Sequence, residues 1–567
     1  MRQFCNILLL LGFMPLILSA KVYVEPTDSI RFYDERWTNI ESGIHVSWTD
    51  KDVSLVRHRL PDIEECSDTT IYVWGGERIG MRGLLYTKDV KDELLTLKVA
   101  KCKSSLNAHV SWMRYVLTDS FDRCGEHPDN LVPWTVAEVI DNPLTKDGVQ
   151  LVVDTCEVRP FWFSVDVDRR CKPGTYPVSV VVSGNNGVKK MLNINVVVLN
   201  KQLPQPADYR FHLDLWQQPY SVSRYYNVEP WSKAHLKLLR PYMRELARMG
   251  QKVVSTILFY EPWGRQSNDK FEPMVQTVRN IGGGWTFDYT VFDRWVNFME
   301  ECGIDEQIDC YSMIPWDMNF RYFDEKTSVY NTLHATTTDD SYKELWTAFL
   351  KDFAKHLREK GWFEKTCIAM DERGLKDMLN AYKIAQEAVP GMKMALAGNI
   401  HNELCDKLYD YSVAYGQLFT KDEVKTRRDA GFKSTVYTCC TDANPGMFSN
   451  SNPVDAAWIP LYCFAAGFDG WLHWSWLNWT DSPLTDSRFF LFAPGDTYFF
   501  YPGVRSSMRH ERMLEGIQQY EKLCIVKSQS NANEKIDAIL YDISNGAPKE
   551  SSQLIKQVNL VEELLNR

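Results

Sequence analysis

The chain has 567 residues, of which 44% are hydrophobic and 24% are charged, and its formal net charge is −10. This composition is that of a folded globular protein and excludes a chain dominated by disorder. The negative balance argues against a nucleic-acid partner, because proteins that bind nucleic acid normally present a basic face. The 19 Trp, 27 Tyr and 27 Phe fit either a large aromatic core or platforms that stack on sugar rings.

The first 20 residues have the pattern of a cleavable export signal. Arg2 precedes an apolar run at 7–18, and the small residues Ser19 and Ala20 follow it. The run is shorter than the roughly 20 apolar residues that a transmembrane helix needs. The alternative is a buried first helix. We predict a signal peptide at 1–20, no transmembrane segment, and export to the periplasm of a bacterium or secretion from it.

Residues 21–204 are predicted to form an antiparallel β-sandwich. This part lacks long helical periodicity, and its short alternating runs are broken by turns such as Gly184-Asn185-Asn186-Gly187. Pro204 and Pro206 favour a stiff linker at its end.

From residue 205 onward, apolar runs alternate with amphipathic helical patterns. The alternation predicts an α/β fold, a (β/α)8 TIM-type barrel over 205–525, with a helical extension over 526–567. A doubly wound sheet is the alternative, but no Gly-rich nucleotide loop follows the first strand, and Gly282–Gly284 fits a flexible loop. The eight predicted strands lie within 209–217, 252–260, 306–316, 365–372, 393–399, 410–416, 434–441 and 470–476.

Thirteen of the 14 cysteines lie beyond the predicted signal peptide, and an odd number cannot all pair within the chain. Cys156 and Cys171 are candidates for a disulfide across a hairpin. Cys439 and Cys440 are neighbours on the seventh predicted strand, so their side chains should face opposite sides. No CxxC or Cys/His spacing resembles a zinc site. We expect mostly buried free thiols, no metal and no cofactor.

Asp371 and Glu372 directly follow the apolar run of the fourth predicted strand. Active sites of such barrels lie at the C-terminal ends of the strands, and two carboxylates there are costly to bury unless they are paired or used. We predict that they are the catalytic residues. The alternative is that they cap the next helix.

Polar and aromatic side chains stand at the ends of other predicted strands and should converge on the same mouth. We predict substrate contacts for these residues, with ordinary packing as the alternative: Tyr260, Trp316, Asn399, Tyr415 and Trp474. Three arginines of the closing helix pattern, Arg505, Arg509 and Arg512, either reach the mouth or form ion pairs on the helix surface.

The adjacency of the two carboxylates favours unequal roles. Neighbours on a strand point in different directions, so one can protonate a leaving oxygen while the other orients a group on the sugar. This geometry suits a reaction in which a 2-acetamido carbonyl attacks the anomeric carbon. Glu372 is then the general acid and later the base, and Asp371 binds the acetamido N–H. Burial and a neighbouring carboxylate would raise the pKa of such an acid.

Several segments resemble glycoside hydrolase family 123, the bacterial β-N-acetylgalactosaminidases, and the wider group that shares their catalytic domain behind an N-terminal β-sandwich. The matching segments lie at 283–304, 370–372, 467–479, 495–503 and 505–523. The resemblance implies a retaining, substrate-assisted release of terminal β-linked N-acetylgalactosamine from glycans or glycolipid head groups, with Asp371 as the acetamido stabiliser and Glu372 as the acid/base.

Two other functions stay open at this point. One is a hydrolase of ordinary hexosides that uses Glu372 with a protein nucleophile, such as Glu261 or Asp317. The other is a glycan-binding protein without catalytic activity. In all three cases the partner is a carbohydrate, and for the leading hypothesis it is a glycan that ends in an N-acetylhexosamine.

Overall fold

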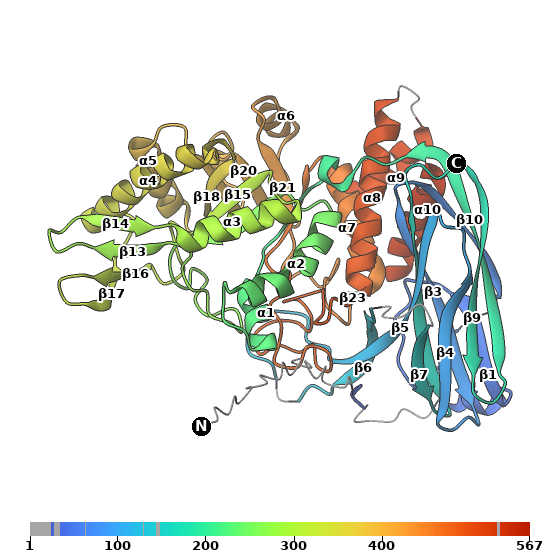
Figure 1. Cartoon of the computed structure of the whole chain (residues 1–567). Helices are drawn as coiled ribbons and strands as arrows, with labels where there is room; N and C mark the ends of the chain where they lie inside the picture. Colours follow the sequence, from blue (N-terminus) through green and yellow to red (C-terminus); the bar gives the residue numbers. More distant parts are fainter. Residues whose placement is uncertain (1–23, 28–33, 63, 129, 143–147, 530–532) are drawn as a thin grey trace, which may run out of the picture.

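The computed structural model describes residues 24–27, 34–62, 64–128, 130–142, 148–529 and 533–567. The predicted signal peptide lies outside these ranges. Within them, no helix combines the length and the apolar character that crossing a bilayer requires. A β-sandwich and a barrel lie side by side, with helix α8 (Met508–Ser528) between them (Figure 1).

The sandwich consists of two packed sheets, as predicted. The inward side chains of the two sheets form a core around Trp48, Trp112 and Phe161. One pairing departs from the antiparallel expectation, because β2 and β10 run parallel. The first sheet has the order β1 (Gly43–Thr49), β3 (Arg78–Lys88), β8 (Glu157–Val167), β5 (Leu106–Thr118), β6 (Trp134–Ile140) and β23 (Ser506–Ser507). The second has the order β2 (Asp68–Gly75), β10 (Lys189–Gln202), β9 (Gly174–Gly184), β4 (Glu93–Lys101) and β7 (Val149–Val153).

The eight strands that the sequence predicts for the barrel are all confirmed. Each is a short run that is buried except for one terminal residue at most, as expected for parallel strands covered on both faces. All the pairings recorded between them are parallel. In spatial order they are β11 (His212–Leu215), β22 (Gly470–His473), β21 (Lys433–Tyr437), β20 (Asp410–Ala414), β19 (Lys393–Gly398), β18 (Thr366–Met370), β15 (Gln307–Tyr311) and β12 (Val253–Ile257).

Two glutamine side chains help to close the barrel between β11 and β12. These strands share a single backbone bridge, Leu213 with Gln251. The Gln251 side chain accepts from Leu215 N at 3.0 Å and donates to Val253 O at 2.7 Å. Gln217 accepts from Ser255 N at 2.9 Å. The side-chain amides therefore take the place of missing backbone bonds.

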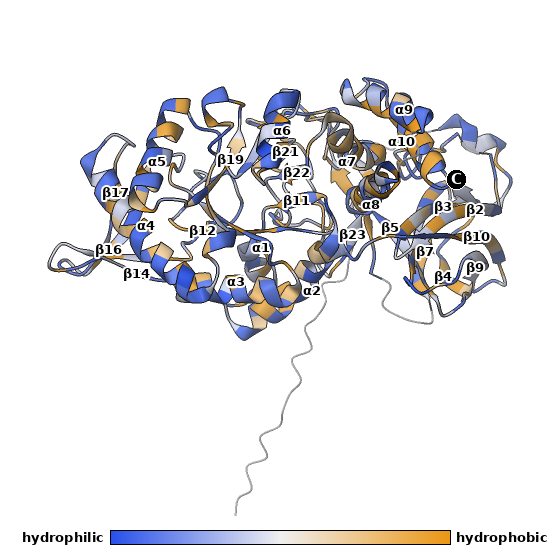
Figure 2. Cartoon of the chain, turned by 90° about the horizontal axis from the view of Figure 1, so that it is seen from above, coloured by the Kyte–Doolittle hydropathy of each residue, from blue (hydrophilic) through white to orange (hydrophobic). Residues whose placement is uncertain are grey.

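Helices α4, α5 and α6 turn hydrophilic faces outward (Figure 2), whereas α7 is buried along most of its length. The predicted helices are present, and the helical extension is built from α9 and α10, which pack on α7 and α8. The helices other than α8 are α1 (Pro219–Tyr226), α2 (Lys233–Arg248), α3 (Thr290–Cys302), α4 (Asp340–Lys360), α5 (Leu375–Ala388), α6 (Lys421–Asp429), α7 (Pro453–Ala466), α9 (Glu534–Ser544) and α10 (Ser551–Leu565).

A four-stranded sheet extends from the barrel on the side away from the sandwich (Figure 1). The sequence patterns did not predict this sheet. Gly282–Gly284, which we expected in a flexible loop, forms the turn of a hairpin, where Asn280 N donates to Gly284 O at 2.8 Å and Gly283 has φ +86°. The sheet has the order β14 (Trp285–Asp288), β13 (Gln276–Arg279), β16 (Asn319–Asp324) and β17 (Val329–His334).

All 13 cysteines in the described part of the chain are free, and seven of them are buried. The expectation of free thiols, most of them buried, is confirmed, and the candidate disulfide between Cys156 and Cys171 is not formed. These residues lie at opposite ends of β8, an 11-residue strand that spans about 35 Å, and not across a hairpin. Cys439 and Cys440 lie in the loop after β21, which ends at Tyr437, so the expectation of opposite strand faces is wrong as well.

The arginines of α8 form buried ion pairs with the sandwich, not surface pairs. The Arg509 guanidinium contacts Glu138 at 2.7 Å, and that of Arg512 contacts both oxygens of Asp52 at 2.8 and 3.0 Å. All four side chains are less than 5% exposed. The pairs fix α8 against the sandwich and explain why a helix of the barrel is charged on a buried side.

Arg512→Met is expected to lower the free energy of unfolding by about 3 kcal/mol, because it leaves the Asp52 carboxylate buried without its partner. Arg428→Met is the matched control, since Arg428 is 59% exposed and pairs with Asp469 at 3.4 Å, and exposed pairs contribute about 1 kcal/mol or less. Thermal denaturation of the two variants tests the difference, and equal shifts in Tm would contradict it.

Candidate active site

A cavity of about 500 Å³ opens at the C-terminal ends of the barrel strands. Its walls come from the ends of strands or the loops behind them: Trp216 after β11, Asp371 and Glu372 after β18, Asn399 after β19, Tyr415 after β20, Tyr437 at the end of β21 and Trp474 after β22. The sandwich adds Cys124 and Gly125 from the β5–β6 loop. Both halves of the chain therefore shape the cavity.

The Asp371 carboxylate is held in a defined orientation. Its Oδ2 accepts a hydrogen bond from the Trp316 indole N–H at 3.0 Å, and its Oδ1 accepts from Glu372 N at 2.9 Å. Burial raises the pKa of Asp371 to about 6, although both hydrogen bonds act in the opposite direction. The carboxylate therefore changes charge in the pH range where enzymes commonly operate.

Glu372 points to a different partner. Its Oε1 accepts a hydrogen bond from the hydroxyl of Tyr437, which lies at the end of β21. Burial, together with this bond, raises the pKa of Tyr437 well above its ordinary value. Tyr437 therefore stays a hydrogen-bond donor at neutral pH.

Neither carboxylate caps the following helix. Helix α5 begins at Leu375, its N-cap residue is Gly374, and no side chain makes a capping hydrogen bond there. The capping alternative from the sequence is thus not supported, and both carboxylates line the cavity.

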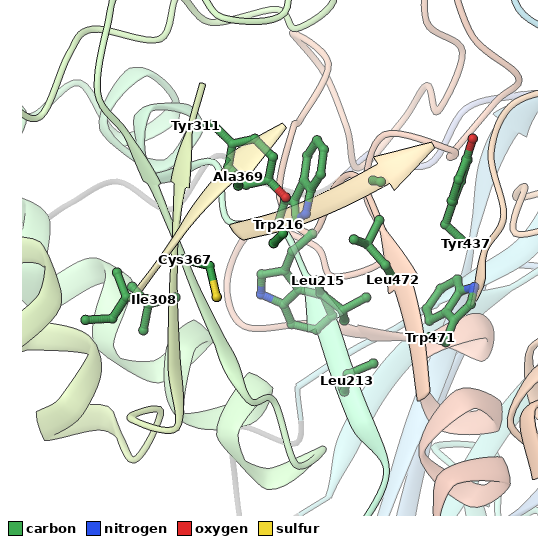
Figure 3. Packing of buried hydrophobic residues seen from close by; sticks show 14 of the residues in the cluster. Leu213, Leu215, Trp216, Ile308, Tyr311, Cys367, Ala369, Tyr437, Trp471 and Leu472 are labelled. Atoms are coloured by element: carbon green, nitrogen blue, oxygen red, sulfur yellow. The ribbon is translucent and has the colours of Figure 1, made fainter. Parts of the chain in front are cut away.

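Indole and phenol rings form one side of the cavity. Trp216 stacks on Trp263 with ring centroids 5.0 Å apart and contacts Tyr311 at 4.5 Å. Figure 3 shows Trp216 and Tyr311 at the end of the barrel interior, beyond Leu213 and Leu215. Trp316, whose side chain bonds Asp371, lines the same cavity. Such rings bury apolar sugar or acetamido surface with little loss of conformational freedom.

Four of the five predicted substrate contacts line the cavity, namely Trp316, Asn399, Tyr415 and Trp474. Some of their polar atoms already have partners. The Asn399 side-chain oxygen accepts from Gln417 at 2.6 Å, and the Tyr415 hydroxyl accepts from Ala547 N at 2.8 Å. A substrate would therefore contact the other atoms of these two side chains.

Tyr260, the fifth predicted contact, does not line this cavity, and its ring lies 4.9 Å from the guanidinium carbon of Arg321. The two candidate protein nucleophiles are also absent from the lining. Glu261 accepts a hydrogen bond from Phe271 N at 2.5 Å, and Asp317 lies beside Gly264.

Sequence reasoning missed three cavity residues of interest. Tyr437 ends a predicted strand, so its position alone was a usable signal. Trp263 and Asp442 lie in loops, where no periodicity marks them. One Asp442 oxygen accepts from Cys439 N at 2.9 Å, and burial raises the pKa of this carboxyl. Across the described ranges, no group of three or more His, Cys, Asp or Glu side chains is arranged to hold a metal ion.

Comparison with known proteins gives the family. The profile of the glycoside hydrolase 123 catalytic domain matches residues 216–526, more than half of the chain. The chain belongs to glycoside hydrolase family 123. The profile of the family's N-terminal domain matches residues 48–184. This glycoside hydrolase is therefore a glycosidase with a carbohydrate substrate. The boundaries at 204 and 525 stay predictions.

A solved structure supports the fold of this glycoside hydrolase. A family 123 glycoside hydrolase from Clostridium perfringens, studied for glycolipid glycan hydrolysis, matches with a TM-score of 0.83 and 24% identity over 93% of this chain and 98% of that chain. A xyloglucanase from Bacteroides ovatus matches with a TM-score of 0.29 and 7% identity over 83% and 100% of the two chains, which is too distant to carry an argument. None of the curated proteins compared with the chain matches it.

Proposed function

We propose that this glycoside hydrolase releases terminal β-linked N-acetylgalactosamine from glycans or glycolipids, with retention of configuration, by substrate-assisted catalysis. One observation carries the proposal. Asp371 and Glu372 are consecutive residues at the cavity, yet their carboxylates have different partners, Trp316 and Tyr437. The similar enzyme from Clostridium perfringens was studied for glycolipid glycan hydrolysis, which supports the substrate class.

Glu372 serves as acid and then as base. In the first step it donates its proton to the glycosidic oxygen while the substrate's acetamido carbonyl oxygen attacks the anomeric carbon. The alcohol leaves and an oxazolinium ion remains. In the second step the Glu372 carboxylate takes a proton from water, which attacks the same carbon and restores the acetamido group. Two inversions give net retention. The Tyr437 hydroxyl keeps Glu372 oriented in both steps.

Asp371 holds the substrate's own nucleophile. Its ionised carboxylate accepts a hydrogen bond from the acetamido N–H, which turns the carbonyl oxygen toward the anomeric carbon and stabilises the positive charge of the oxazolinium. The indole of Trp316 fixes the carboxylate. Trp216 and Trp263 supply the apolar surface against which the acetamido methyl group packs.

The rival hydrolase mechanism needs a carboxylate nucleophile in the same cavity. Glu261 and Asp317 do not line it, whereas Asp442 does. Incubation with a 2-deoxy-2-fluoro galactoside that has a good leaving group separates the mechanisms. A covalent adduct on Asp442 would favour a protein nucleophile. Substrate assistance predicts no adduct, because the probe has no acetamido group.

The proposed activity is tested with aryl β-glycosides. We expect hydrolysis of aryl β-N-acetylgalactosaminide, with β-N-acetylgalactosamine as the first product detected by NMR, and no measurable hydrolysis of aryl β-galactoside. The aryl β-N-acetylglucosaminide measures selectivity at the single axial hydroxyl. Glycan binding without turnover of any of the three would instead support the non-catalytic function, and turnover of the galactoside alone would exclude substrate assistance.

A further inference from the structure

Three tryptophans that line the cavity in the described part of the chain donate their indole N–H to an aspartate. The pairs and their N–O distances are Trp316 with Asp371 at 3.0 Å, Trp216 with Asp214 at 3.3 Å and Trp474 with Asp496 at 3.0 Å. The other indole donors recorded in the described ranges bond to backbone carbonyls, a hydroxyl or an amide, as for Trp295 and Trp479. A carbonyl therefore satisfies a buried indole, and a buried carboxyl, which is more costly, calls for another reason.

The pair of Asp496 and Trp474 is the clearest of the three, because the proposed reaction makes no use of Asp496. The Asp496 side chain is 1% exposed. Its Oδ2 accepts from the Trp474 indole, and no described residue donates to its Oδ1. Burial raises the pKa of this carboxyl to about 7. Within the described residues, the indole is thus the one hydrogen-bond partner of a carboxyl that is costly to bury.

An ion pair that serves the fold does not account for Asp496. The Arg509 guanidinium donates to Glu138 at 2.7 Å and to two backbone carbonyls. His473 Nε2 lies 3.8 Å from the Asp496 carboxyl and bonds to the backbone oxygen of Asp496 at 2.9 Å. Burial also lowers the pKa of His473 to about 4, so its ring is neutral at neutral pH. Neither base is bonded to the carboxyl.

The backbone bonds hold both partners of the pair in place. The Trp474 carbonyl accepts from the Gln218 amide at 3.0 Å, and His473, the residue before Trp474, is bonded to Asp496 as above. The indole ring itself is only partly buried, and it meets Phe492 with ring centroids 4.8 Å apart. Packing therefore leaves the ring room to turn, and the N–H bond to the carboxyl fixes its direction.

We propose that Asp496 is a positioning residue of this glycosidase, which holds the Trp474 indole as a fixed surface for the sugar ring. Asp496 acts through Trp474 and does not touch the substrate. The inference rests on the proposed function in so far as the cavity is the substrate site, but it does not depend on which sugar is cleaved. A fixed apolar surface binds the ground state and the transition state alike, so its loss raises KM and leaves kcat nearly unchanged.

Steady-state kinetics tests the proposal on whichever of the three aryl β-glycosides the wild type hydrolyses fastest. Asp496→Leu removes the acceptor at similar volume and should raise KM about three- to tenfold, with kcat within about twofold of the wild type. Asp496→Asn should keep KM within about twofold, because its amide oxygen can accept from the indole. If Asp496→Leu does not fold, Asp496→Ala removes the same acceptor and is judged by the same outcomes.

Asp455→Leu is the matched control. Asp455 is also buried, its Oδ2 accepts from Gly446 N at 3.0 Å, and no described residue donates to its Oδ1. It does not line the cavity, so its loss should leave KM unchanged. An equal rise in KM in both variants, or a fall in kcat alone in Asp496→Leu, would overturn the positioning role.

A double-mutant cycle tests whether Asp496 acts through the indole. In Trp474→Phe there is no N–H to orient, so adding Asp496→Leu should raise KM no further. A second rise by the same factor as in the wild-type background would show that the two residues act independently, and would overturn the proposal.

Fluorine NMR of protein labelled with 5-fluorotryptophan gives a readout that needs no turnover. The Trp474 signal is the one that is missing from Trp474→Phe. It should be a single line in the wild type, Asp496→Asn and Asp455→Leu, and a broadened or doubled line in Asp496→Leu, where the ring takes more than one orientation. A single line of wild-type width in Asp496→Leu would overturn this inference, whereas no hydrolysis of any of the three aryl glycosides would contradict the proposed function alone.

Discussion

Glu372→Gln is expected to lower kcat/KM on a glycan substrate by about 10²–10⁴-fold, the range over which a positioned general acid acts. The amide retains the size of the side chain and can still accept a hydrogen bond from the Tyr437 hydroxyl. However, it cannot protonate an alkoxide leaving group. An aryl glycoside with a good leaving group should lose much less in the first step, because that bond breaks with little protonation. Steady-state kinetics on both substrates measures the contrast.

Azide sharpens the test of the second step. The Glu372→Gln enzyme cannot deprotonate water, so the oxazolinium should accumulate, whereas azide attacks the anomeric carbon without a base. We expect azide to accelerate turnover of the activated substrate and to yield the β-glycosyl azide. Glu261→Gln serves as the control and should retain wild-type rates. Retention of more than a tenth of wild-type activity on the glycan by Glu372→Gln would remove the acid role.

The main architecture follows from local patterns. The eight barrel strands are apolar runs between helices with one hydrophobic face, so both periodicities were visible in the sequence. The four-stranded sheet from Gln276 to His334 was missed for the opposite reason. Its strands are four to six residues long and partly exposed, so their alternation is too short to stand out from a loop.

The site was predictable where strands end and not where loops meet. Asp371, Glu372 and Trp316 were found because an apolar run stops immediately or shortly before them. Tyr260 satisfied the same rule yet lies outside the cavity, with its ring against the guanidinium of Arg321. Contacts across domains, such as the hydrogen bond from Gly125 N to Leu491 O, depend on docking that no local pattern encodes.

The charged residues on α8 show a further limit of prediction from sequence. An arginine on an amphipathic helix is usually solvated. Ion pairs on the helix surface were therefore the natural interpretation of Arg509 and Arg512. Their burial follows from the sandwich that covers the helix and supplies Glu138 and Asp52. The partner of a buried charge is a property of tertiary structure, and sequence position alone does not reveal it.

Asp371→Asn is expected to reduce kcat/KM on aryl β-N-acetylgalactosaminide by about 10²–10³-fold, as for loss of one preorganised group that stabilises charge in the transition state. Asparagine fits the same space, but it cannot neutralise the oxazolinium. The wild-type enzyme should lose activity as pH falls through about 6, where burial places the pKa of Asp371. This acidic limb should disappear in the variant.

Trp316→Phe separates the charge of Asp371 from its position. The indole N–H lowers the pKa of Asp371, so its removal should move the acidic limb of kcat/KM to higher pH while leaving a limb in place. A limb that stays near pH 6 in Asp371→Asn would assign it to another group, such as Asp442, whose pKa is also raised by burial.

The raised pKa of Asp371 also affects the stability of the fold, because ionising the buried carboxyl lowers the free energy of unfolding. In the unfolded chain the carboxyl ionises near its ordinary pKa of about 3.9, whereas in the folded chain it keeps its proton up to a pH of about 6. Between these values the folded state binds more protons, so stability falls as pH rises through this window. The cavity is open to solvent, which reduces the effect, and we expect a loss of about 1–2 kcal/mol.

Asp371→Asn should therefore be more stable than the wild type at pH 7.5 by about 1–2 kcal/mol, and the difference should vanish below a pH of about 4, where the carboxyl is neutral in both states. Parallel thermal denaturation of the two proteins across this range measures it, because contributions from all other groups cancel in the comparison. A variant that is both slower and more stable above pH 6 is the signature of a buried charge kept for catalysis. A variant that is destabilised at pH 7.5 would instead give Asp371 a structural role, with its bond to Trp316 as the reason for its place at the end of β18.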